Sequence, residues 1–102
     1  MPTAKVVNPG IGSNHTYMDP APITVKFVGV SPYSWKVEIG YAPGANDIYP
    51  GTEILASSGY VDSGVVGLPD SNSLCYTKVK YRTAVGGAWK SVYGNETTFT
   101  CI

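Results

Sequence analysis

Charged residues, histidine and long apolar runs are all scarce in this chain of 102 residues. Only 14% of the residues are charged, and seven Lys and Arg balance seven Asp and Glu, so the formal net charge is zero. Proteins that bind duplex DNA or RNA usually carry an excess of basic residues that displaces counterions from the phosphates. The balance of charge therefore argues against nucleic acid as a partner.

Membrane and secretion signals are also missing. No segment approaches the roughly eighteen consecutive apolar residues that a spanning helix requires, so we expect no membrane insertion. The N-terminus lacks the basic and then apolar profile of a secretion signal, so we expect a start chosen by cloning or a product made without a signal. A chain of this length forms about one domain, residues 1–102, with little depth for a substrate cleft.

Windows that could hold an uninterrupted helix are rare, because twelve glycines and eight prolines divide the chain into short segments. The main exception, residues 70–85, alternates between apolar and polar positions and therefore predicts a strand. The alternation places Cys75, Thr77, Val79 and Tyr81 on the buried side of that strand and Tyr76, Lys78, Lys80 and Arg82 on the other side.

The same period of two predicts half-buried strands at residues 23–27 and 35–39. Their inward side chains are Ile23, Val25 and Phe27 in the first strand and Trp35, Val37 and Ile39 in the second. Shorter strands are predicted between turn signals at residues 5–7, 53–56, 64–68 and 97–101. About seven short strands in a hundred residues are typical of an all-β, antiparallel two-sheet sandwich with Greek-key connections.

Three segments share features with a known family, namely residues 37–49, residues 65–69, and residues 74–79 followed by Gly87-Ala88-Trp89. They contain a strand that leads into a Pro-Gly turn, a Gly-Leu-Pro corner before a tyrosine-containing strand, and a Gly-x-Trp turn before the last strand. In these features residues 37–101 resemble the fibronectin type III or immunoglobulin-like modules of bacterial extracellular and polysaccharide-associated proteins. The resemblance implies one immunoglobulin-like domain and specifies architecture rather than chemistry.

Two cysteines, Cys75 and Cys101, are too few for a zinc site, and the single histidine does not complete one. A hairpin centred near Ala88 would set the two cysteines directly opposite each other, and Cys101 is in phase with the inward Phe99. We therefore predict a disulfide that closes a loop of about 27 residues and contributes about 3.5 kcal/mol in an oxidising compartment. The alternative is a pair of buried free thiols that act as small apolar side chains.

Catalytic groups are sparse. His15 lies in a predicted loop without a nearby nucleophile, so a surface histidine is the simpler interpretation. No pair stands out among the carboxylates that could serve glycoside cleavage, which are Asp19, Glu38, Asp47, Glu53, Asp62, Asp70 and Glu96. Residues 70–73 could offer oxygen ligands to calcium, but a tight turn requires the same residue types. We expect no enzymatic activity, no metal and no cofactor.

Positive charge gathers on the polar side of the strand at residues 74–82. The row consists of Tyr76, Lys78, Lys80 and Arg82, and Lys36 with Glu38 on the expected neighbouring strand extends it. Such a face could bind an acidic glycan, an acidic protein surface or a partner subunit. The alternative is an ordinary solvated sheet face, on which lysines discourage association.

Aromatic residues add to this candidate surface. Trp35 is predicted in the core because its neighbours alternate with it, whereas Trp89, at the predicted hairpin tip after Gly86-Gly87, is the candidate exposed contact ring. Tyr76 could instead hydrogen-bond back across the corner at residues 67–69, although its parity with Lys78 favours an outward ring.

These features predict a non-catalytic module displayed on a larger assembly, such as a virion, an extracellular filament or a cell surface. It would act through contacts with a protein scaffold or with other copies of itself, and glycan is a further candidate partner. An accessory carbohydrate-binding or spacer domain of a secreted polysaccharide-degrading enzyme or adhesin is the alternative. Both interpretations place the protein outside the cell or on a virion surface.

Overall fold

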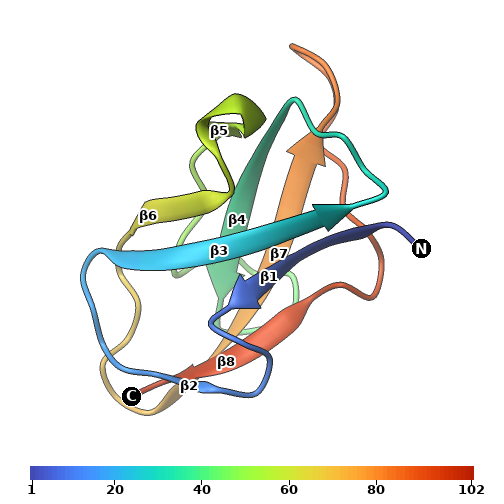
Figure 1. The fold of residues 1–102 in the computed structure, drawn as a ribbon. Coiled ribbons are helices and arrows are strands. Elements are labelled where there is room, and N and C mark those ends of the chain that lie inside the picture. The colour runs from blue at the N-terminus through green and yellow to red at the C-terminus, as the bar shows by residue number, and fades with distance from the viewer.

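The computed structural model describes all 102 residues and contains two β-sheets (Figure 1). The three-stranded sheet has the order β1-β3-β6, with β1 at Thr3–Asn8, β3 at Ala21–Val28 and β6 at Val61–Val65. The five-stranded sheet has the order β2-β8-β7-β4-β5, with β2 at Asn14–His15, β8 at Thr97–Cys101, β7 at Ser73–Arg82, β4 at Ser34–Gly40 and β5 at Ile54–Leu55. A short 3-10 turn, η1, covers Ala56–Ser58. The predicted all-β, two-sheet class is confirmed.

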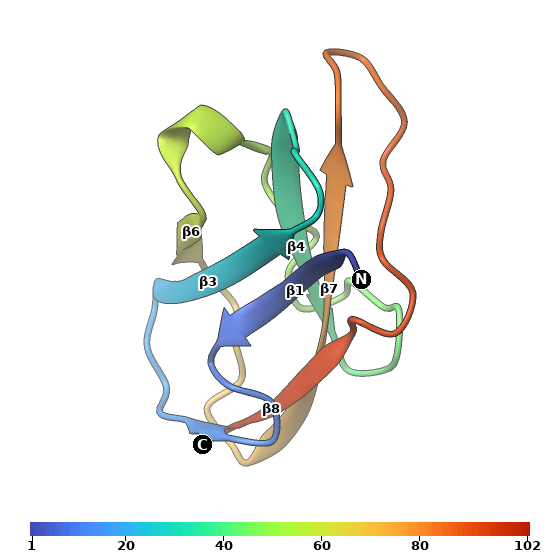
Figure 2. The same cartoon turned by 45° about the vertical axis from the view of Figure 1, so that its right-hand side comes forward.

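The two sheets lie face to face with the core between them. Figures 1 and 2 show β1 and β3 crossing in front of β4 and β7, with the chain termini well separated. The core holds fifteen buried apolar residues, which are Ala4, Val6, Ala21, Ile23, Val25, Trp35, Val37, Ile39, Tyr49, Val65, Leu68, Cys75, Val79, Phe99 and Cys101. Both sheets contribute to it, as expected of a β-sandwich-like fold.

The central strand pair of the larger sheet follows the predicted alternation. β4 and β7 are antiparallel, and the inward pairs are Trp35 with Tyr81, Val37 with Val79 and Ile39 with Thr77. Trp35 is fully buried, as predicted, and its indole Nε1 donates to the Gly59 carbonyl oxygen at 3.0 Å. That bond satisfies the one polar atom of the largest core side chain.

Three short strands differ from the predicted boundaries. The strand predicted at residues 64–68 lies earlier, at Val61–Val65, because Asp62 is buried and breaks the apolar alternation that the prediction relied on. The strand predicted at residues 53–56 is the two-residue β5 followed by η1. Strand β2 was not predicted, because it consists of only two residues that pair in parallel with the end of β8.

His15 is one residue of β2, so the prediction of a surface loop histidine is wrong. The ring lies edge-on to Phe99, with 5.8 Å between centroids, and its Nε2 is buried without a hydrogen-bond partner. The predicted turn at residues 70–73 is confirmed, since Asn72 adopts φ 43° and the Ser73 hydroxyl donates to the Ser71 carbonyl oxygen.

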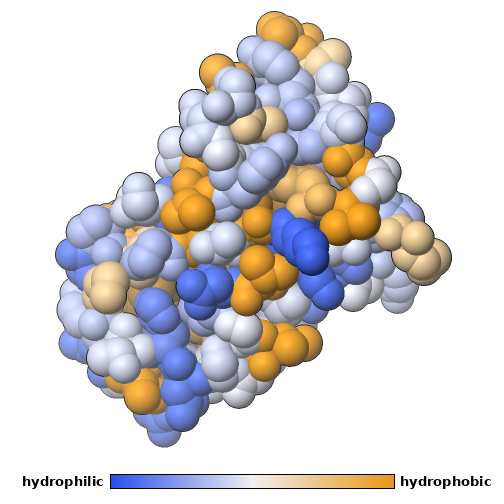
Figure 3. All heavy atoms as spheres, in the orientation of Figure 1, coloured by the Kyte–Doolittle hydropathy of each residue, from blue (hydrophilic) through white to orange (hydrophobic).

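The surface of the three-stranded sheet is mixed in polarity. On the side shown in Figure 3, hydrophobic atoms form separate clusters among polar atoms. No helix of the structure has the length and apolar character needed to cross a bilayer.

Candidate functional site on the five-stranded sheet

The outer face of β4 and β7 carries most of the residues predicted to bind a partner. Its cross-strand pairs are Ser34 with Arg82, Lys36 with Lys80, Glu38 with Lys78 and Gly40 with Tyr76. The structure therefore brings the predicted strand residues Lys36, Tyr76, Lys78, Lys80 and Arg82 to one face. Lysines placed directly opposite each other repel, so the Lys36 and Lys80 pair requires a compensating anion.

Glu38 supplies that anion. Its Oε1 lies 3.2 Å from Lys80 Nζ, and its Oε2 lies 3.8 Å from Lys36 Nζ. The residue is only 4% exposed, so its carboxylate depends on these two lysines for compensation of its charge. A carboxylate shared between two cations removes much of the repulsion on this face and lowers its net charge.

Glu53 neutralises the charge of Arg82, although the sequence pattern did not predict this pair. The Arg82 Nε donates to Glu53 Oε2 at 3.0 Å and its Nη2 donates to Glu53 Oε1, so the contact is bidentate. The hydroxyl of the buried Ser34 donates to the same carboxylate at 2.6 Å. These hydrogen bonds, that from Arg82 first, hold the pKa of Glu53 below its ordinary value.

Trp89 does not form an exposed hairpin tip, so that prediction is wrong. The long connection from β7 to β8 runs beyond the end of β7 and returns beside it (Figure 2). Two backbone bonds between Tyr81 and Lys90, of 2.8 Å and 2.7 Å, pin the returning segment to β7. The half-buried ring of Trp89 thereby meets Lys36 Nζ and Arg82 Cζ, each 4.6 Å from its centroid.

We call this arrangement the Trp89 cluster, and it consists of Lys36, Glu38, Glu53, Lys80, Arg82 and Trp89. Each cation in it has a carboxylate within 4 Å, and two of them also contact the aromatic ring. Cation-π contacts and ion pairs of this kind stabilise a protein modestly at partly exposed sites. The cluster therefore anchors the β7–β8 connection, and its charges are largely engaged within the chain.

The rest of the face remains open, and we call it the open patch, consisting of Tyr76, Lys78 and Thr98. Lys78 is the one cation of the face with no carboxylate within 4 Å. Tyr76 pairs across the sheet with Thr98 of β8, and its hydroxyl makes no hydrogen bond to the rest of the chain. Tyr76 points outward rather than bonding across a corner, as its parity indicated.

A buried polar network that the sequence did not indicate connects the two sheets. Tyr49, in the loop after β4, donates its hydroxyl proton to Asp62 Oδ2 on β6 at 2.7 Å. The Thr52 hydroxyl oxygen lies 3.0 Å from the Tyr49 hydroxyl oxygen, and Gly64 N–H donates to Asp62 Oδ1 at 3.0 Å. Burial raises the pKa of Tyr49, and the bond to Asp62 adds to the rise while Thr52 opposes it. The sequence did not predict this contact, because a tyrosine in a loop and an aspartate in a short strand follow no common pattern.

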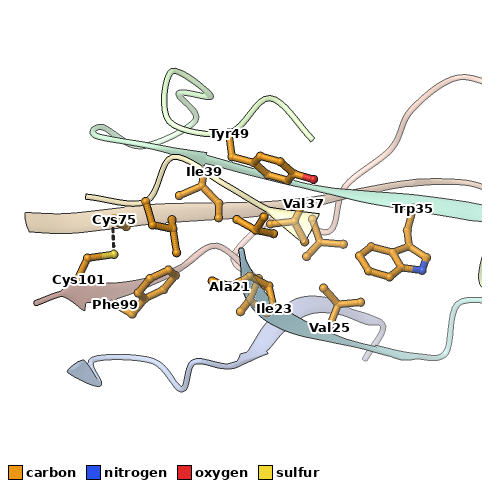
Figure 4. Close-up of a cluster of buried hydrophobic side chains, with 14 of the residues drawn as sticks. Ala21, Ile23, Val25, Trp35, Val37, Ile39, Tyr49, Cys75, Phe99 and Cys101 are labelled. Carbon is orange, nitrogen blue, oxygen red and sulfur yellow. Dashed lines mark hydrogen bonds between the residues drawn. The ribbon is translucent and has the colours of Figure 1, made fainter. Parts of the chain in front are cut away.

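Cys75 and Cys101 are adjacent but not directly opposite. Cys75 pairs with Phe99, and Cys101 pairs with Ser73, so the prediction of a directly opposed pair is wrong. The register centres the hairpin on Gly87 rather than Ala88, which shifts β8 by two residues relative to β7. The two Sγ atoms are nevertheless 3.1 Å apart, as free thiols (Figure 4). The predicted disulfide remains a prediction.

The rest of the surface offers few groups that could bind a metal or a ligand. The structure has no group of three or more His, Cys, Asp or Glu side chains arranged to hold a metal. One open cavity of about 260 Å³ lies at the seam between β1 and the start of β8, lined by Lys5, Val6, Val7, Gly10, Ile11 and Thr97. The open patch is separate from this cavity.

Comparisons with protein-family models, with curated proteins and with solved structures found no match to this chain.

Proposed function

We propose that this chain is a non-catalytic, immunoglobulin-like module that is displayed on a larger assembly, such as a virion, an extracellular filament or a cell surface. The strand order supports the immunoglobulin-like assignment. If β1, β3, β4, β5, β6, β7 and β8 are lettered A, B, C, C′, E, F and G, one sheet reads A-B-E and the other G-F-C-C′. In this scheme β2 is a short additional strand beside G.

The open patch is the observation that carries the functional proposal. The Trp89 cluster uses three cations of the face within the chain, whereas Lys78 and the hydroxyl of Tyr76 keep their bonding capacity for a partner. The tyrosine ring has only two side-chain torsions and therefore loses little conformational entropy on binding, and the unpaired cation beside it supplies charge for an acidic group. The patch thus fits an acidic or polar surface of a protein scaffold.

The first test concerns the native assembly. We expect intact-mass analysis and imaging of particles from the native source to find this domain at many regularly repeated positions on the particle. Recovery of these residues only within a much longer secreted polypeptide would overturn the decorating role and support an accessory carbohydrate-binding or spacer domain.

The second test concerns the surface used. Lys78→Glu reverses the unpaired charge of the open patch, and we expect it to lower occupancy on particles that have been stripped and refilled by at least about tenfold. Lys26→Glu is the matched control, because it makes the same change at an exposed position on the other sheet. Equal loss with both variants would indicate a general charge effect, and loss with neither would exclude the patch.

A further inference from the structure

Cys75 and Cys101 form a diagonal pair in the core, at the opposite end from Trp35 (Figure 4). Both residues are 0% exposed, and their sulfur atoms are 3.1 Å apart. Sulfur atoms bonded in a disulfide are separated by about 2.05 Å, so bond formation needs an approach of about 1 Å. Side-chain rotation and the flexing of two neighbouring strands can supply that approach.

The C-terminal end of β8 is held in place by residues 11–17. Thr100 N–H donates to the Ser13 carbonyl oxygen at 2.9 Å, and Ile102 N–H donates to the His15 carbonyl oxygen at 3.0 Å. Tyr17 N–H in turn donates to the Ile102 carbonyl oxygen at 2.9 Å. Residues 11–17 therefore hold both neighbours of Cys101 in the chain, and we call them the strap.

We propose that Cys75 and Cys101 are the site of a covalent cross-link, made by a small-molecule disulfide or a disulfide-donating protein before the strap closes over β8. Once the chain has folded, the pair is closed to thiol–disulfide exchange in either redox state. The redox state of the two cysteines in the folded protein therefore shows whether the chain folded under oxidising or reducing conditions. This inference rests on the geometry of the pair and is independent of the proposed function.

The chemistry balances with oxidised glutathione as the oxidant. The Cys101 thiolate attacks one glutathione sulfur, which forms a mixed disulfide and releases one glutathione thiolate. The Cys75 thiolate then attacks the Cys101 sulfur, which closes the cross-link and releases the second glutathione thiolate. The protein loses two electrons and two protons, and the protons end on two reduced glutathiones.

The mixed-disulfide step is what the folded chain obstructs. It would attach a tripeptide to a sulfur atom that has no exposed surface, so β8 must first separate from the strap or from β7. The thiolate is also scarce. Burial raises the pKa of Cys101, the thiol that attacks glutathione, and raises that of Cys75 from 9.0 to about 12, so both thiolates are rarer at pH 8 than the thiolate of an exposed cysteine.

The test compares oxidation of the folded and unfolded chain. Protein folded under reductant and then freed of it is incubated with oxidised glutathione at pH 8, in native buffer or during refolding from guanidinium. We expect refolding to give a single product that is 2 Da lighter, whereas the native sample keeps both thiols and oxidises at least about a hundredfold more slowly. Equal rates would overturn the closed pair, and glutathione adducts or free thiols after refolding would overturn the cross-link.

Two variants complete the test, one as a control for the reagent and one for the role of the strap. Ser57→Cys introduces an exposed cysteine in η1 and should take up one glutathione rapidly in native buffer, which shows that the reagent is active. Tyr17→Pro removes the N–H that the strap donates to Ile102, and we expect it to speed native oxidation by at least about tenfold. A rate unchanged from that of the parent chain would exclude the strap as the barrier.

Discussion

Removing the hydroxyl of Tyr49 should measure how strongly the buried polar network joins the two sheets. In Tyr49→Phe the Asp62 carboxylate, which is 5% exposed, loses the donor to Oδ2 and retains only Gly64 N–H on Oδ1. A hydrogen bond to a charged group contributes about 1.5–3 kcal/mol, and the unpaired oxygen cannot recover it from water. We therefore expect the free energy of unfolding to fall by about 2 kcal/mol, which lowers Tm by roughly 8–16 °C in a domain of this size.

The assay is equilibrium unfolding in urea, followed by the fluorescence of Trp35 and Trp89 and by circular dichroism. Coincident transitions from the two probes would justify a two-state free energy. Tyr76→Phe is the matched control, because it removes the same atom from a tyrosine whose hydroxyl makes no bond within the chain. We expect that variant to remain within about 0.5 kcal/mol of the parent.

A double-mutant cycle tests the assignment to Asp62. If the stranded carboxylate causes the loss, Tyr49→Phe should cost less than about 0.5 kcal/mol in the background of Asp62→Ala. A loss of less than 0.5 kcal/mol in the parent chain, or an equal loss from Tyr76→Phe, would refute the reasoning.

Two further predictions concern a close backbone approach and the Trp89 cluster. Gly40→Ala should destabilise the chain by about 2 kcal/mol in urea unfolding, because the new Cβ would lie 2.5 Å from the Ala45 backbone. Gly10→Ala, whose Cβ meets nothing within 4 Å, should stay within about 0.5 kcal/mol, and equal effects would contradict this. The lowered pKa of Glu53 means that its pairing with Arg82 stabilises the fold above the unfolded pKa and is lost as pH falls through the folded pKa. The stability difference between the parent and Glu53→Gln should therefore shrink from pH 7 to pH 3, and a constant difference would exclude the ion pair as its source.

Part of the candidate site could be predicted from the sequence. The alternation along residues 74–82 and 35–39 placed Tyr76, Lys78 and their neighbours on one outer face, since side chains of a strand point to opposite sides in turn. The pattern carried no information about Glu53, which reaches Arg82 from a loop 29 residues away along the chain. The sequence therefore indicated a basic face, whereas in the folded chain three of its four cations lie within 4 Å of a carboxylate.

The positions of the cysteines and of Trp89 near the β7–β8 connection could not be predicted from the sequence either. A two-residue turn fixes the register of a hairpin, but residues 83–96 form a long connection whose path depends on what it packs against. The actual register sets Cys75 against Phe99, and the returning segment lays Trp89 over Lys36. Neither position follows from local spacing.

By itself, the sequence determined the all-β class, the main strands and the inward side of each, because period-two alternation and frequent glycine and proline are local properties of the chain. Only the tertiary structure decided which residues of distant segments contact one another. The parallel pairing of β2 with β8, the bond from Tyr49 to Asp62 and the closure of the Trp89 cluster all join segments that are distant in sequence. Such contacts form because burying the core brings those segments together, so their partners are set by the packing of the whole domain.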